Sequence, residues 1–237
     1  KRKLSKRKDP ELALSYYHEA GVPQEATWLY LLTVLNSNFE EWHMEHPDAS
    51  SHDFTFSLEK MSTSGALFDL EKLDNIAKEY LSRQTADFVY DGLLTWAKDY
   101  DTALAERMTR KAEFYKAAIN VGRGGDKPRK DYGNWKDAAQ FLAFYDAETF
   151  TVSDPCPENA DGEMRQEILT RYLDTLDFAD TQEAWFAKVK ELTEALGYAA
   201  QPKKYKKNPE LYKGSIVDVT NLLRVALTGR QNAPDIW

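Results

Sequence analysis

Apolar residues recur at helical spacing along most of the chain, and this pattern constrains the fold more than any other feature. Residues 69–81 would place four apolar side chains on one face of a helix, namely Leu70, Leu73, Ala77 and Leu81. No run of alternating apolar and polar residues long enough for a useful strand occurs anywhere. The sequence therefore predicts a mainly α protein.

Helix start and stop signals extend this prediction over most of the sequence. One helix ends at Gly21 and another opens at Pro23, and further helices are expected over 85–100, 105–121, 135–145, 162–176, 181–196 and 215–227. Residues 36–57 and 123–133 are too polar or too rich in Gly and Pro to be helical. The segment 153–157, with two prolines, is the best candidate for a linker.

Composition excludes several classes of protein. The single Cys156 excludes an internal disulfide framework and any Cys-rich zinc module, and it is compatible with a reducing cytosol. No stretch approaches the roughly 20 apolar residues that cross a membrane. The formal charge of −8 taken alone argues against nucleic-acid binding.

The distribution of charge reverses that argument. Residues 1–8 carry a local +6, residues 107–136 another +6 and residues 201–213 a further +4, so the rest of the chain must carry −24. Such asymmetry suggests one positively charged face on an acidic body. The alternative is that each basic run is a solvated loop without a partner.

The sequence gives little support for a metal site, a catalytic thiol or a nucleotide-binding loop. His43, His46, His52 and Asp53 could suggest a metal cluster, but Pro47 breaks any helix after His46 and nothing else supplies a converging ligand. Polar loop histidines are the better interpretation, and we expect no metal site. Cys156 has no nearby histidine, so a catalytic thiol is not expected. The glycines after Arg123 lack the strand and helix that flank a phosphate-binding loop.

The loop 123–133 nevertheless combines residue types that bind RNA. Lys127, Arg129 and Lys130 could neutralise phosphates, and the neighbouring Tyr132 and Trp135 could stack on unpaired bases. The alternative for these two aromatic residues is packing between helices, which sequence reasoning favours. The charges are harder to explain without a partner.

Three motifs resemble one enzyme family. Lys3–Arg7 reads KLSKR and resembles the second signature of class I aminoacyl-tRNA synthetases, usually written KMSKS, in the form common among glutamyl enzymes. Gly65–Leu73 looks like the family's start of a helix after the stem-contact fold, and Leu223–Gly229, followed by Pro234, is similar to its closing segment. The motifs appear in family order over the whole chain, which resembles the C-terminal part of a bacterial-type glutamyl-tRNA synthetase.

The resemblance implies a division into four regions. Residues 1–8 would be the signature loop at the end of a catalytic domain that lies upstream, and 9–81 the stem-contact region. Residues 82–154 and 155–237 would form two helical subdomains that bind the anticodon. The first signature motif of the family is absent, so this fragment alone should not activate glutamate. Asn75–Lys78 replaces the Trp-x-Asn-Gly of many relatives, which suggests a divergent branch.

The resemblance also assigns residues to ATP and tRNA. Lys6 would meet the phosphates of ATP as the catalytic lysine, Ser5 and Arg7 would support the loop, and Lys3 would be a secondary contact. The family reads the third anticodon base with an arginine just before a helix, for which Arg129 is the better match, ahead of Arg123. The remaining residues expected to contact tRNA are basic, namely Lys127, Lys130, Lys203, Lys204, Lys206 and Lys207.

The implied protein is a cytoplasmic, monomeric glutamate–tRNA ligase that uses ATP, Mg²⁺ and L-glutamate to charge tRNA(Glu). None of these small molecules is expected to bind the fragment itself. The sequence leaves open whether tRNA(Gln) is also charged. The alternative function is a non-enzymatic helical RNA-binding module or a helical scaffold that binds protein.

Overall fold

The chain is described by a computed structural model over residues 13–46, 49–61, 68–158, 162–233 and 236. Within these ranges it contains twelve α-helices and three short 3-10 helices. No β-strand occurs among the described residues, and one isolated bridge joins Ala199 to Ser215. This confirms the prediction of a mainly α fold. In the same ranges, no helix is both long and apolar enough to span a membrane.

The chain divides into two compact units, Lys1–Ala143 and Phe144–Trp237. The candidate linker 153–157 therefore lies inside the second unit. The division reflects packing alone, so the four functional regions expected from the sequence remain predictions. We describe each unit by itself.

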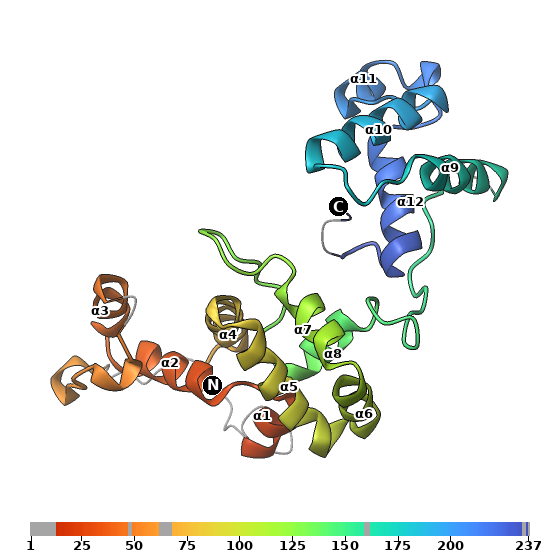
Figure 1. The fold of residues 1–237 in the computed structure, drawn as a ribbon. Helices are drawn as coiled ribbons and strands as arrows, with labels where there is room; N and C mark the ends of the chain where they lie inside the picture. Colours follow the sequence, from red (N-terminus) through yellow and green to blue (C-terminus); the bar gives the residue numbers. More distant parts are fainter. Residues whose placement is uncertain (1–12, 47–48, 62–67, 159–161, 234–235, 237) are drawn as a thin grey trace. The chain divides into compact units, whose positions relative to one another are not determined.

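The first unit is built around the pairing of α2 with α4 and around α5, which contacts α6, α7 and α8 (Figure 1). Helix α1 packs against α8. Two 3-10 turns, Ser51–Asp53 and Leu58–Lys60, lie between α3 and α4. The helices of this unit are α1 (Leu14–Ala20), α2 (Gln24–Leu35), α3 (Phe39–Glu45), α4 (Leu70–Arg83), α5 (Ala86–Tyr100), α6 (Thr102–Arg110), α7 (Ala112–Asn120) and α8 (Trp135–Leu142).

Polar caps and an apolar face explain why α4 and α5 form where they do. The Asp69 side chain accepts hydrogen bonds from the backbone N–H groups of Glu71 and Lys72, and Thr85 caps α5 in the same way. Such caps satisfy donors that have no partner inside the helix. Leu73, Ala77 and Leu81 of α4 are buried, as the periodic pattern predicts, whereas Leu70 is 38% exposed.

The segment 36–57 is more regular than predicted, because it contains α3. Aromatic rings one turn apart hold this short helix: Phe39 stacks on His43, and Trp42 stacks on His46. Phe39 and Trp42 also pack with Phe54. The polar composition of residues 36–57 did not predict these contacts, because the partner residue Phe54 lies outside the helix.

The predicted helix over 105–121 is two helices, because the backbone breaks at Lys111 with φ −119° and ψ 41°. Leu104 and Met108 are buried before the break, and Tyr115 and Ile119 after it. Both short helices contact α5. The apolar pattern runs through the break without interruption, so local spacing could not reveal it.

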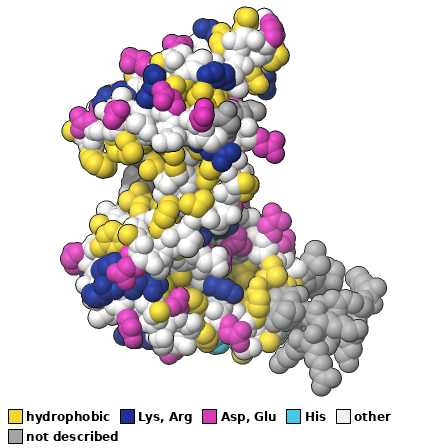
Figure 2. Space-filling model, turned by 90° about the vertical axis from the view of Figure 1, so that its right-hand side faces the viewer, with side chains coloured by type: hydrophobic (Ala, Val, Ile, Leu, Met, Phe, Trp, Pro, Cys, Tyr) yellow, Lys and Arg dark blue, Asp and Glu magenta, His cyan; other side chains and the backbone are white. Residues whose placement is uncertain are grey.

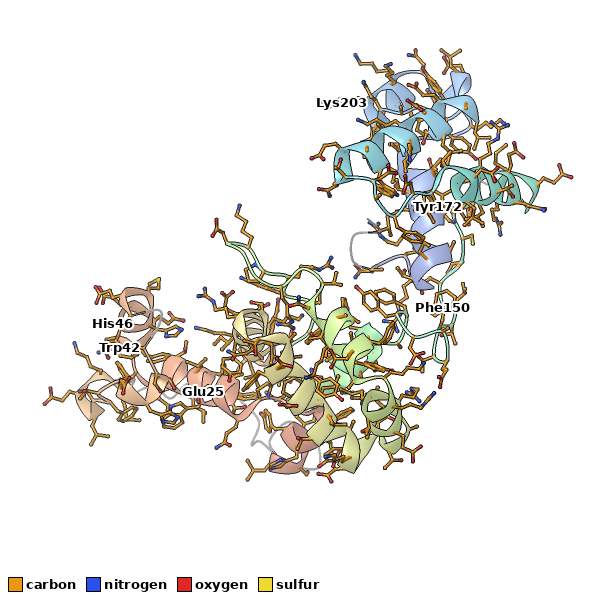
Figure 3. The ribbon with its side chains drawn as sticks, in the orientation of Figure 1. Glu25, Trp42, His46, Phe150, Tyr172 and Lys203 are labelled. Carbon is orange, nitrogen blue, oxygen red and sulfur yellow. The ribbon has the colours of Figure 1, made fainter. Side chains whose placement is uncertain are left out.

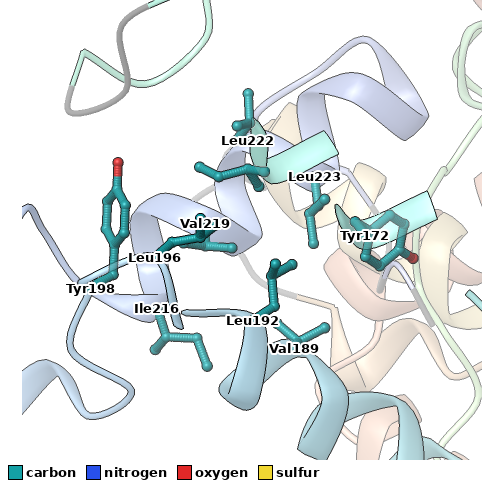
Figure 4. Close-up of a cluster of buried hydrophobic side chains, with 10 residues drawn as sticks. Tyr172, Val189, Leu192, Leu196, Tyr198, Ile216, Val219, Leu222 and Leu223 are labelled. Atoms are coloured by element: carbon teal, nitrogen blue, oxygen red, sulfur yellow. The ribbon is translucent and has the colours of Figure 1, made fainter. Parts of the chain in front are cut away.

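The second unit packs its helices around one apolar cluster. The prediction of helices near 162–176, 181–196 and 215–227 is confirmed by α9 (Gly162–Thr175), α10 (Gln182–Ala195) and α12 (Ile216–Thr228). The short α11 (Pro202–Lys207) and a 3-10 turn at Pro209–Leu211 were not expected. Figure 4 shows the core, which consists of Ile168, Tyr172, Val189, Leu192, Leu196, Tyr198, Ile216, Val219, Leu222 and Leu223.

Helix α12 has defined ends that tie it to the start of the unit. Ser215 and Asp218 form a reciprocal capping box at its N-terminus. Gly229 ends it with φ +74°, and its carbonyl oxygen accepts the backbone N–H groups of Ser153 and Asp154. A Cβ on Gly229 would collide with the Thr151 carbonyl. The glycine in the closing motif is therefore required by both its dihedral angle and its neighbours.

Candidate nucleic-acid interface

Four of the residues expected to bind ATP, namely Lys3, Ser5, Lys6 and Arg7, lie outside the described residues. The residues expected to bind tRNA are all described. They fall into two groups, one on the loop between α7 and α8 in the first unit and the other on α11 in the second unit.

The loop between α7 and α8 can be followed in Figure 1. Arg123 anchors the start of this loop. Its Nη1 donates hydrogen bonds to the carbonyl oxygens of Leu81 (2.6 Å) and Gln84 (3.3 Å), at the C-terminal end of α4. Its Nε donates to the carbonyl of Ile119 at 2.8 Å, and Nη2 to the hydroxyl of Tyr132 at 2.6 Å. Arg123 thus joins α4, α7 and the end of the loop, and its donors are engaged by protein groups.

Tyr132 and Trp135 pack inside the first unit, with 5% and 9% of their surfaces exposed. The Trp135 ring lies directly against Gly92, which has no side chain to block it. Burial raises the pKa of Tyr132 above its ordinary value, and the guanidinium of Arg123 opposes this rise. The structure therefore favours the packing role for both aromatic residues over stacking on bases.

Arg129 lies in the same loop and pairs with Asp131. Its Nε and Nη2 each donate a hydrogen bond of 2.9 Å to one carboxylate oxygen of Asp131. The backbone N–H of Arg129 donates to the carbonyl of Gly122 at 3.1 Å, which closes the base of the loop tip. The tip of the loop extends beyond this closure. Gly124 and Gly125 in the tip have positive φ, and Asp126 and Lys127 are exposed.

Lys130 and Arg83 share the carboxylate of Glu79. The hydrogen bond from Lys130 is the largest cause that lowers the pKa of Glu79, and Arg83 adds to it against the opposing effect of burial. The Glu79 carboxylate thus bridges α4 to the loop. Two cations around one carboxylate leave this part of the surface with a positive excess.

A groove of about 840 Å³ runs between the loop, the end of α4 and the start of α5. Its lining contributes four cations (Arg83, Arg123, Lys127 and Lys130) and two carboxylates (Glu79 and Asp126). Four of the other lining residues have polar side chains, namely Ser82, Gln84, Thr85 and Asn120. A groove with excess positive charge and many hydrogen-bonding groups suits a polyanion such as the backbone and bases of an unpaired RNA segment.

The second group consists of Lys203, Lys204, Lys206 and Lys207, all exposed on α11. Lys203 is labelled in Figure 3. Tyr205, between them, is only partly exposed. On the face shown in Figure 2, basic side chains lie in separate groups among acidic ones. The prediction of a single positive face across the chain stays a prediction.

The histidines that suggested a metal cluster point to aromatic neighbours instead. His43 stacks on Phe39, His46 on Trp42 (Figure 3), and His52 on Trp28. The Nε2 of His52 lies 3.4 Å from a carboxylate oxygen of Glu25. Among the described residues, no group of three His, Cys, Asp or Glu side chains could hold a metal ion.

Sequence reasoning missed the acidic partners Glu79 and Asp131 and two further arginines. Arg107 on α6 and Arg224 on α12 each have a buried Nε without a hydrogen-bond partner among the described residues. Asp131 could have been noticed, since it lies two residues after Arg129. Glu79 carries no such signal, because it is far from Lys130 along the chain.

The fold and the anchored loop define a helical protein whose first unit carries a groove with more cationic than anionic side chains. No protein-family model matches the chain. The glutamate–tRNA ligase of Acetivibrio thermocellus is 46% identical over 237 residues, which cover all of this chain and 43% of that protein. The glutamate–tRNA ligases of Clostridium perfringens and Sorangium cellulosum are each 43% identical, again over this whole chain and 44% and 42% of their lengths.

The chain is therefore homologous over its full length to glutamate–tRNA ligases, which are aminoacyl-tRNA synthetases. It spans less than half the length of these relatives.

Proposed function

We propose that this chain is the tRNA-binding part of a glutamate–tRNA ligase, in which residues 9–81 contact the inner bend of the L-shaped tRNA(Glu) and the helices from 82 onward bind its anticodon. The observation that carries this proposal is the identity of 46% with one such ligase over all 237 residues. The basic groove beside the loop supports it, because its charge and polar lining suit RNA.

In this proposal Arg129 reads the third anticodon base. Arginine presents parallel N–H donors that can pair with a base edge, which lysine cannot do. Arg129 is preferred to Arg123 because Arg123 is bonded to the carbonyls of α4 and α7 and to Tyr132, whereas the Asp131 carboxylate that holds Nε and Nη2 of Arg129 lies in the loop itself. Lys127, Lys130 and the four lysines of α11 would contact phosphates.

The catalytic part of the proposal concerns Lys6. ATP supplies the adenylyl group that activates glutamate, and Mg²⁺ neutralises its phosphates. A lysine ammonium placed at the phosphates would stabilise the charge that accumulates on the departing pyrophosphate. Ser5 and Arg7 would support that loop, and Lys3 would be a secondary contact. We assign no Mg²⁺ ligand in this chain, and we propose that the whole ligase is a cytoplasmic monomer.

Salt dependence of tRNA binding tests the RNA-binding part. We expect the affinity of the chain for tRNA(Glu) to fall steeply with salt, and Lys127→Ala to reduce the slope of log K against log salt by about 0.7–0.9, the effect of one phosphate contact. Lys98→Ala, which removes an exposed lysine of α5, serves as the matched control. A flat salt response would favour a scaffold that binds protein.

Activity of the longer ligase tests the role of Lys6. Lys6→Ala should strongly reduce glutamate- and tRNA-dependent exchange of pyrophosphate into ATP, while tRNA binding by the same variant stays unchanged. Full exchange activity in that variant would remove Lys6 from the proposed mechanism.

A further inference from the structure

Asp131 holds the guanidinium of Arg129 by two parallel hydrogen bonds. Both measure 2.9 Å, from Nε to Oδ2 and from Nη2 to Oδ1. The side chains of Arg129 and Asp131 are 27% and 22% exposed, so the pair is partly shielded from water. A two-point contact between a guanidinium and a carboxylate defines the plane of the guanidinium as well as its position.

The stem of the Arg129 side chain is fixed by Gly122. A Cβ at Gly122 would overlap the Cδ of Arg129, so the arginine stem occupies the space that a side chain would take. Gly122 has φ +71°, and its carbonyl accepts the backbone N–H of Arg129. Its neighbour Arg123 is bonded to the carbonyls of α4. A continuous set of contacts therefore runs from α4 to the guanidinium of Arg129.

We propose that Asp131 is a positioning residue, which orients Arg129 before RNA binds and thereby sets the base selectivity of the site. The inference rests on the proposed function, in which Arg129 reads the third anticodon base. A long side chain that is already ordered loses less conformational entropy on binding. An ordered plane also restricts which base edges can meet the donors, so the main effect should fall on discrimination.

A purely electrostatic role for Asp131 predicts a different result. Removing a carboxylate near RNA phosphates should strengthen binding of every tRNA by a similar factor, because a repulsion is lost. Loss of positioning should instead reduce the difference between correct and incorrect bases. Asp126 offers a matched control, since it is an exposed carboxylate on the same loop.

The experiment measures dissociation constants of the 237-residue chain for four tRNA(Glu) transcripts that differ only in the third anticodon base. Asp131→Asn should reduce the preference for the best transcript by about tenfold, within the range that one two-point contact with a base supplies. Asp126→Asn removes a carboxylate that lines the groove, so it should strengthen binding of all four transcripts by a similar factor and leave the preference between them unchanged. Asp131→Glu keeps the charge but displaces the carboxylate, so it should reduce the preference as well, and it provides the test if Asp131→Asn fails to fold.

Arg129→Gln separates the two proposals. If it keeps the wild-type preference, Arg129 does not read the base, and both the assignment of Arg129 and this inference are wrong. If Arg129→Gln loses the preference while Asp131→Asn and Asp131→Glu keep it, only the positioning role is wrong. A parallel loss in all three variants supports both.

An NMR signal gives a readout that does not depend on RNA. The Nε–H resonance that disappears in Arg129→Gln belongs to Arg129, and in the wild-type chain its hydrogen should exchange slowly with water. Asp131→Asn should speed that exchange at least severalfold, and Asp126→Asn should not change it. Unchanged exchange in Asp131→Asn would overturn the positioning role.

Discussion

The guanidinium of Arg123 and the ring of Tyr132 hold each other in place at the centre of the candidate site. Nη2 of Arg123 donates a 2.6 Å hydrogen bond to the Tyr132 hydroxyl, and the guanidinium carbon lies 5.7 Å from the ring centroid. The remaining donors of Arg123 reach carbonyls of α4 and α7. The shape of the loop thus depends on a contact between Arg123 near its start and Tyr132 near its end.

We expect Arg123→Met to destabilise the first unit by about 2–4 kcal/mol, since several carbonyls and a hydroxyl lose a charged donor. Urea unfolding followed by circular dichroism measures this change. Arg83→Met is the control, because the Arg83 side chain is 62% exposed and its loss should change stability by less than about 1 kcal/mol. Equal stability of the two variants would mean that Arg123 does not hold the loop.

Tyr132 should make stability fall at alkaline pH. Burial raises its pKa above the ordinary value near 10, so the folded state prefers the neutral phenol. The associated stability is fully present below pH 10 and is lost as the pH rises through the folded-state pKa. Tyr132→Phe should show a shallower loss of stability in urea unfolding as the pH rises above the ordinary pKa of a tyrosine. An identical pH dependence in both proteins would contradict this assignment.

We expect Glu79→Gln to strengthen tRNA binding several-fold at low salt, because Lys130 and Arg83 would lose the carboxylate that they share. The salt dependence should become steeper. Filter binding at several salt concentrations measures both effects, and Glu71→Gln, on the first turn of the same helix, is the control. Unchanged binding in Glu79→Gln would mean that this pair lies outside the RNA surface.

Gly229→Ala should destabilise the second unit by more than about 2 kcal/mol. The residue has φ +74°, which costs a side chain about 1–2 kcal/mol, and the new Cβ would meet the Thr151 carbonyl. Gly162→Ala is the control, since a Cβ there meets nothing within 4 Å. Thermal unfolding of the two variants makes the comparison, and similar melting temperatures would contradict the prediction.

Replacing Lys203 and Lys207 together by Ala should weaken tRNA binding and reduce its salt slope by up to about 1.8, the effect of two phosphate contacts. Lys190→Ala is the control on α10 of the same unit. Its ammonium lies over the ring of Phe186. An unchanged slope in the double variant would place α11 away from the RNA.

Local sequence signals predicted most helices but not how they are subdivided. The spacing of Leu73, Ala77 and Leu81 identified α4 because helical periodicity depends only on near neighbours. The break at Lys111 and the helix α3 were missed, since both depend on partners elsewhere in the chain. The lysine cluster was found, but its short helix α11 was not.

At the candidate site too, the sequence predicted local features but not the contacts that packing creates. The sequence placed the excess of positive charge in the loop 123–133 and ranked Arg129 ahead of Arg123, but from a loose resemblance alone. It left open whether Tyr132 and Trp135 stack on RNA or pack inside the protein. Their burial favours packing, and it could not be read from the loop itself.

The sequence by itself determined a mainly helical protein with a basic loop, because helix formation and local charge are properties of neighbouring residues. Only the tertiary structure decided which protein groups the basic residues of the loop contact. Arg123 reaches carbonyls of α4 that lie 42 positions earlier in the chain, Lys130 reaches Glu79, and Arg129 is oriented by Asp131. Two of these contacts join segments that are distant along the chain, and the third depends on how the loop turns, so none of them follows from helical periodicity.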